Sequence, residues 1–83
     1  MNEPTTLRLV PARGAVRYAL DDRVLGGGDL IELCCSGGWL TGRFEWDGDV
    51  AEPPRFFFSI ECVGGVAQQS LAIPENALVR LRA

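Results

Sequence analysis

Hydrophobic and polar residues alternate along most of this chain, with the two-residue period of a half-buried β-strand. The alternation is clearest over residues 39–46, where successive side chains would point to opposite faces. One face carries Leu40, Gly42, Phe44 and Trp46, and the other carries Trp39, Thr41, Arg43 and Glu45. The same alternation recurs over residues 14–20, 30–35, 55–62, 69–73 and 77–82. No segment of ten residues has the apolar spacing of a helix, so the pattern predicts an all-β fold.

Turn residues separate these segments at short intervals. Asp21-Asp22 and three glycine-rich stretches (26–28, 36–38 and 63–65) lie between the alternating runs, and residues 47–54 form an acidic loop with two prolines. Short strands with turns about every 8–12 residues indicate a sandwich or a barrel, and a sandwich usually needs about 100 residues. We therefore expect a small barrel of five or six antiparallel strands. A single 3₁₀ turn is expected near residues 74–76, where Pro74 suits the first position.

One glycine lies inside the clearest predicted strand. Gly42 falls between Leu40 and Phe44. A glycine within a strand is typical of a sharp bend or of a position where another backbone passes closely. We expect one or the other at Gly42.

Two stretches of the sequence resemble bacterial SH3-like small β-barrel domains. Residues 28–33 (GDLIEL) are similar to the glycine-aspartate turn that leads into an apolar strand in such domains, and residues 38–45 (GWLTGRFE) are similar to the strand that Gly-Trp opens there. Residues 73–80 are similar to the end of these domains, where a one-turn 3₁₀ helix leads into the last strand of the barrel. The resemblance spans Ala15 to Arg82. It implies an SH3-like domain over residues 14–83, preceded by a flexible N-terminal segment or edge strand over residues 1–13.

The resemblance also implies a range of ligands. Such barrels bind peptides, methylated side chains, nucleic acids or their own copies. Binders of proline-rich peptides have neighbouring tyrosines, whereas this chain has one tyrosine, Tyr18. Proline-peptide binding is therefore not expected.

The composition removes most catalytic chemistry. The 83 residues suffice for one domain with a thin core, which self-association would help to stabilise. All eight basic residues are arginine, so no histidine can act as a base near neutrality and no lysine can form a Schiff base. A carboxylate pair such as Glu32 and Glu45 is better explained as solvated charge. We expect a protein that is not an enzyme and has no cofactor.

The remaining chemistry-bearing residues do not form a known metal or redox pattern. Adjacent Cys34 and Cys35 would point to opposite faces of a strand, and Cys62 leaves an odd number. We expect three reduced, mostly buried thiols. The acidic loop departs from a calcium-binding loop, because Phe58 stands where that loop has its bidentate glutamate. Residues 1–13 contain no long apolar run, so we expect neither a signal peptide nor a membrane span. We therefore expect a cytoplasmic protein.

Outward-facing aromatic residues are the most informative functional feature. Over residues 55–62 the alternation predicts an inward face of Phe56, Phe58 and Ile60. If Leu40, Phe44 and Phe58 face the core, then Trp39 and Phe57 point outward. Arg43 and Arg55 would flank them, and interfaces are enriched in such aromatic and arginine side chains. The predicted contact residues are Trp39, Phe57, Arg43, Trp46 and Arg55, with Trp46 and the acidic loop at the rim.

The sequence leaves two binding functions open. One is a non-catalytic module that binds another protein or its own copy, for example as a homodimer through an edge strand near Leu7 or Leu81. The alternative is a nucleic-acid-binding barrel that uses its dispersed arginines and an exposed tryptophan. The net charge of −3 disfavours the alternative, because phosphates would be repelled.

Overall fold

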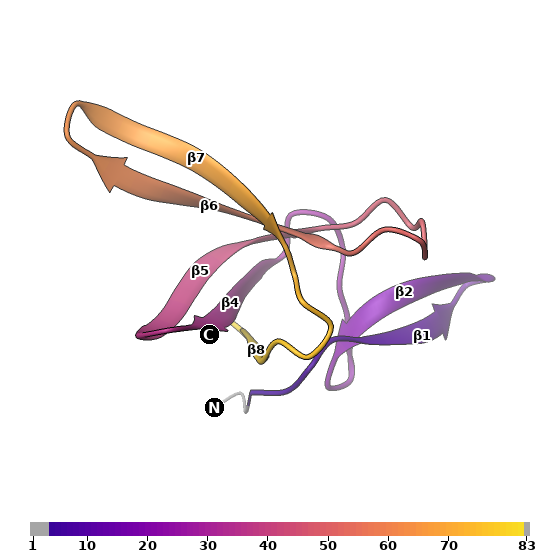
Figure 1. The fold of residues 1–83 in the computed structure, drawn as a ribbon. Helices are drawn as coiled ribbons and strands as arrows, with labels where there is room; N and C mark the ends of the chain where they lie inside the picture. Colours follow the sequence, from indigo (N-terminus) through magenta and orange to yellow (C-terminus); the bar gives the residue numbers. More distant parts are fainter. Residues whose placement is uncertain (1–3, 83) are drawn as a thin grey trace.

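The protein is built from antiparallel β-strands arranged in two sheets (Figure 1). The computed structural model describes residues 4–82, and no helix occurs within that range. The strands are β1 (Arg8–Ala12), β2 (Ala15–Leu20), β3 (Arg23–Val24), β4 (Leu30–Cys35), β5 (Gly38–Glu45), β6 (Arg55–Cys62), β7 (Gly65–Ala72) and β8 (Val79–Leu81). The all-β prediction is confirmed. Eight strands replace the expected five or six, because the short segments β1 and β3 also pair.

The pairings define the sheets. One sheet has the strand order β1-β2-β3, and the other has the order β7-β6-β5-β4-β8. The barrel closure expected from the sequence is not shown by these pairings. Between β7 and β8 the amide of Ala77 donates to the carbonyl of Pro74 (3.1 Å), which makes a single turn, and a 3₁₀ helix there is not confirmed.

Two hairpin turns share the sequence Cys-x-Gly-Gly and the same backbone conformation. Cys35 pairs with Gly38 across one turn, and Cys62 pairs with Gly65 across the other. The two glycines of each turn have φ near +95° and +150° (94° and 148°, 95° and 152°). These left-handed values are costly for any residue with a Cβ, so the glycines fix where both hairpins reverse.

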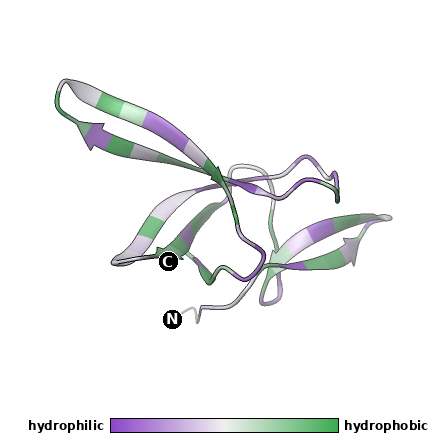
Figure 2. Cartoon of the chain, viewed as in Figure 1, coloured by the Kyte–Doolittle hydropathy of each residue, from purple (hydrophilic) through white to green (hydrophobic). Residues whose placement is uncertain are grey.

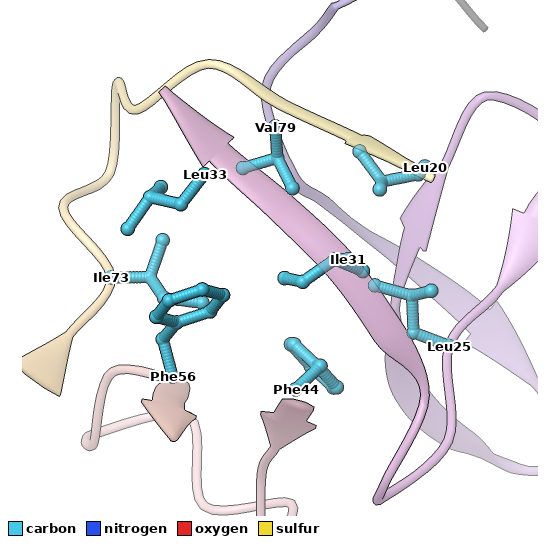
Figure 3. Packing of buried hydrophobic residues seen from close by; sticks show 8 residues of the cluster. All are labelled: Leu20, Leu25, Ile31, Leu33, Phe44, Phe56, Ile73 and Val79. Carbon is cyan, nitrogen blue, oxygen red and sulfur yellow. The ribbon is translucent and has the colours of Figure 1, made fainter. Parts of the chain in front are cut away.

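The two sheets share one hydrophobic core (Figure 3). It contains Leu20, Leu25, Ile31, Leu33, Phe44, Phe56, Ile73 and Val79. Leu20 ends β2 and Leu25 follows β3, whereas Phe44 and Phe56 lie on central strands of the larger sheet. Every second residue is buried in the middle of β4 (Ile31 and Leu33) and near the end of β5 (Gly42 and Phe44), as the alternation predicts.

Gly42 is the point where β6 passes close to β5. A Cβ at Gly42 would lie 2.4 Å from the carbonyl oxygen of Phe57 and 2.6 Å from Cζ of Phe56. The predicted close approach is therefore confirmed. It lets β5 pair with β4 over residues 38–43 and with β6 over residues 43–45, so the strand belongs to both halves of the sheet.

The β6–β7 hairpin extends beyond the rest of the sheet (Figure 1). β6 pairs with β5 only from Arg55 to Phe57, whereas β6 and β7 pair over their whole length. We call residues 58–69 the ribbon. Ile60, expected to face inward with Phe58, is 44% exposed, because among the described residues no second layer covers this part of the hairpin.

Candidate interaction surface

The outer face of the larger sheet, opposite the core, carries four of the five predicted contact residues. The register places Arg43 directly opposite Phe57, and Glu45 opposite Arg55. Directly opposed residues of an antiparallel pair project from the same face. The Arg43 guanidinium carbon lies 5.7 Å from the centre of the half-buried Phe57 ring, within cation–π range. Arg43, Arg55 and Phe57 therefore form one patch.

Trp39 lies on the same face but beside a different arginine. The guanidinium carbon of Arg80 stacks 3.9 Å above the Trp39 ring. Arg80 also donates from Nε to Oε1 of Glu32 (2.7 Å), and the Thr41 hydroxyl donates to the other oxygen (3.3 Å). The hydrogen bond from Arg80 lowers the pKa of Glu32 below its ordinary value. Trp39 is half-buried under this network.

Arg80 is not among the contact residues predicted from the sequence. Its role depends on β8 pairing with β4, which sets Arg80 opposite Glu32. That pairing joins residues 48 positions apart. Alternation within one segment reveals which residues share a face, but it does not reveal which distant strands are neighbours.

Trp46 anchors the acidic loop and packs against the core. Its Nε1–H donates to the carbonyls of Asp49 (3.2 Å) and Glu52 (3.1 Å). Its ring meets Tyr18 edge-on, with centroids 4.7 Å apart. Trp46 thus lies on the core side of the larger sheet, whereas the patch around Phe57 lies on its outer face. Both residues nevertheless line one hollow.

This open hollow has a volume of about 610 Å³ and lies between the loop and the sheet. It is lined by Glu45, Trp46, Asp47, Asp49, Glu52, Pro53, Arg55 and Phe57. Four carboxylates against one guanidinium make it strongly acidic, which favours cationic groups and repels phosphate. Within residues 4–82, no group of three or more His, Cys, Asp or Glu side chains is arranged to hold a metal ion.

The ribbon adds exposed apolar side chains that are not among the predicted contact residues, and two of them, Ile60 and Val66, project from opposite faces of the hairpin. Ile60 is 44% exposed, Val66 is 64% exposed and Val63 is fully exposed at the tip. Figure 2 shows hydrophobic segments on both strands of this hairpin. Local alternation assigned Ile60 to the interior, and only the structure shows that the body ends at Phe57.

The three cysteines are free and exposed, so the prediction of mostly buried thiols is wrong. Cys35 and Cys62 directly precede the two glycine turns, where no other strand covers the hairpin. Cys34 lies opposite Trp39 on the outer face. Within residues 4–82, no second layer covers any of these three positions.

The described residues contain no helix of the length and hydrophobicity that crossing a membrane requires. Comparison of the chain with protein-family models, with curated proteins and with solved structures gave no match in any of the three. The SH3-like resemblance therefore stays a prediction.

Proposed function

We propose that this protein is a non-catalytic interaction module that binds another protein or its own copy. The observation that carries the proposal is the ribbon, which leaves the body after Phe57 and exposes Ile60, Val63 and Val66. A two-stranded hairpin is marginally stable in water by itself and gains stability from a packed neighbour. A partner on the outer face of the ribbon would supply that neighbour and cover Val66, whereas Ile60, which pairs with Ala67, projects from the other face.

Polar contacts keep the ribbon ordered for such a partner. On the outer face, the Gln68 amide donates to the Ser59 hydroxyl within the ribbon (2.9 Å), and Arg55 donates to the Ser70 hydroxyl at its base (2.8 Å). Both contacts join β6 to β7. A surface that is already ordered loses less conformational entropy when it binds.

The patch around Phe57 continues the surface onto the sheet. Phe57 is the last residue of β6 paired with β5, and Arg43 and Arg55 lie directly beside it. An aromatic ring with arginine at its edge is the kind of residue set that contributes most to protein interfaces. We place Phe57, Arg43 and Arg55 within the contact region, and Trp39 under Arg80 at its margin.

Photo-crosslinking from two equally exposed valines tests the proposal. A photoreactive amino acid replaces Val66 on the ribbon (64% exposed) or Val50 on the acidic loop (66% exposed), in the cells that naturally make the protein. We expect a discrete adduct from position 66 that is absent or much weaker from position 50. Equal adducts at both positions, or none at position 66, would contradict the proposal.

Nucleic-acid binding is the competing outcome, and it is measured separately. Fluorescence anisotropy of a labelled single strand at low salt would rise on binding and fall steeply with added salt. We expect no rise, because Arg80 is paired with Glu32 and four carboxylates surround Arg55.

A further inference from the structure

The outer edge of β7 is long and unprotected. β7 ends the larger sheet, and its only neighbour among the described strands is β6. Its eight residues, GVAQQSLA, include no charged residue and no proline. Natural edge strands usually carry lysine, proline, a bulge or a cover that prevents pairing with another chain. β7 contains neither lysine nor proline, and no described element covers its outer edge.

The other edges of the described sheets are protected. β1 contains Arg8 and Pro11, and proline cannot donate to a neighbouring strand. β3 has only two residues. The outer side of β8 is covered by Thr5, which exchanges two backbone hydrogen bonds with Val79 (2.9 and 2.7 Å). Pairing near Leu81 or Leu7, expected from the sequence, is therefore less favoured than pairing at β7.

One hydrogen bond shows which β7 amides face outward. The amide of Ile73 donates to the carbonyl of Pro54 (2.9 Å), just before the Arg55–Ala72 pair. In an antiparallel ladder, hydrogen-bonded and non-hydrogen-bonded pairs alternate. The backbone groups of alternate residues therefore point away from β6. These residues are Val66, Gln68, Ser70 and Ala72.

The side chains of β7 leave this edge open. Gln68 is turned toward Ser59, and Ser70 accepts a hydrogen bond from Arg55, so both lean back onto β6. Val66 and Ala72 have no polar groups that could bond to the free backbone. The edge is thus open to another strand.

We propose that β7 pairs antiparallel with β7 of a second copy, about a two-fold axis at Gln69. In this register Val66 lies opposite Ala72 of the other copy, and Gln68 lies opposite its Ser70. All four outward-facing residues of each copy are then used. Four pairs that exchange two bonds each give eight backbone hydrogen bonds, and the two larger sheets become one continuous sheet.

The charges beside the edge are compatible with this register and this partner. Glu61 pairs with Val66, and Arg55 pairs with Ala72. The proposed register therefore places Glu61 of one copy in the same row as Arg55 of the other, about 14 Å away across three strand spacings. The arrangement occurs twice by symmetry. At this distance salt screens most of the attraction, so the relevant point is that no like charges are directly opposed in this register.

The two-fold arrangement also limits the assembly to two copies. The same edge is used by both copies, so pairing stops at a dimer and leaves no free β7 for further growth. Val66, 64% exposed in the single chain, gains Ala72 of the second copy as a cross-strand neighbour. The inference rests on the proposed function and names its partner as a second copy of this chain.

Sedimentation velocity over a concentration series tests the inference on the full chain. Gln68→Pro removes an outward-facing donor without touching a bond to β6, whereas Gln68→Thr keeps the donor. Both variants lose the contact to Ser59, so they are matched. We expect a wild-type dimer, a dissociation constant at least about tenfold higher for Gln68→Pro, and a change below about threefold for Gln68→Thr. Gln68→Lys, which puts a charge on the edge, is a second test should the proline variant not fold.

Three results would overturn the inference: a monomer at every concentration, a dimer that resists both Gln68→Pro and Gln68→Lys, or an open series of larger species. If the chain is monomeric while position 66 still crosslinks to a different protein, the second copy is excluded and the proposed function stands. If position 66 forms no adduct at all, the proposed function fails with it.

Discussion

Adding one methyl group at Gly42 should destabilise the protein more than any other glycine-to-alanine change with ordinary backbone angles. The new Cβ of Gly42→Ala would lie 2.4 Å from the backbone oxygen of Phe57 and 2.6 Å from the Phe56 ring. Non-bonded carbon atoms normally approach to about 3.5–4.0 Å, so relief needs a shift of about 1 Å. The Phe57 carbonyl belongs to the paired part of β6, and Phe56 is fully buried, so neither can move freely.

The magnitude follows from two opposing contributions. Overpacking of a well-packed site costs about 1–3 kcal/mol, and loss of glycine freedom in the unfolded chain returns about 0.4–1 kcal/mol. Because the clash at Gly42 is with a backbone oxygen that is held in the sheet, the upper end of the overpacking range applies, and the expected net loss is about 2 kcal/mol, a large part of the stability of a chain this short. With a urea m-value of about 1 kcal/mol/M, the unfolding midpoint should fall by about 2 M.

Urea unfolding followed by tryptophan fluorescence measures the effect at one fixed protein concentration. Gly26→Ala is the matched control, because the backbone there is ordinary and the nearest atom to a new Cβ is Nη2 of Arg17 at 3.5 Å. The control should stay within about 0.5 kcal/mol of the wild type. Equal midpoints for Gly42→Ala and wild type would refute the close crossing of β5 and β6.

Three further outcomes follow from the structure. Trp46→Phe removes the donor to two loop carbonyls, so residues 47–54 should exchange amide hydrogens faster, with a global loss of about 1–2 kcal/mol; unchanged exchange would contradict the anchoring role. The pKa of Glu32 is lowered by Arg80, so its contribution to stability is complete above the ordinary glutamate pKa and is lost as the pH falls through the lower folded value. The difference in urea midpoint between wild type and Glu32→Gln should therefore shrink on acidification, and a constant difference would count against the ion pair. All three thiols should react with a disulfide reagent in the native protein nearly as fast as in urea, and a slow class would argue against their exposure.

Much of the fold was predictable because it depends on local sequence. Side-chain alternation marks a strand wherever one face is buried, and the glycines mark turns that need left-handed angles. Gly42 was recognised because a glycine inside a strand is typical of a sharp bend or of a close approach by another backbone. These signals placed Arg43 and Phe57 on one face before any pairing was known.

The rest depends on which distant segments meet. Arg80 covers Trp39 only because β8 pairs with β4, and no local pattern encodes that contact. Ile60 and the cysteines were assigned to the interior because alternation specifies a face but not whether anything covers it. For the same reason the free edge of β7 could not be distinguished from a central strand.

Hydrogen exchange of the β7 amides at two protein concentrations tests the central claim most directly. Ala67, Gln69 and Leu71 bond to β6 and should be protected in dilute and concentrated samples alike. The amides of Val66, Gln68, Ser70 and Ala72 should exchange quickly when dilute and become protected when concentrated, as β7 pairs with its copy. Fast exchange of these four amides at every concentration would contradict the account.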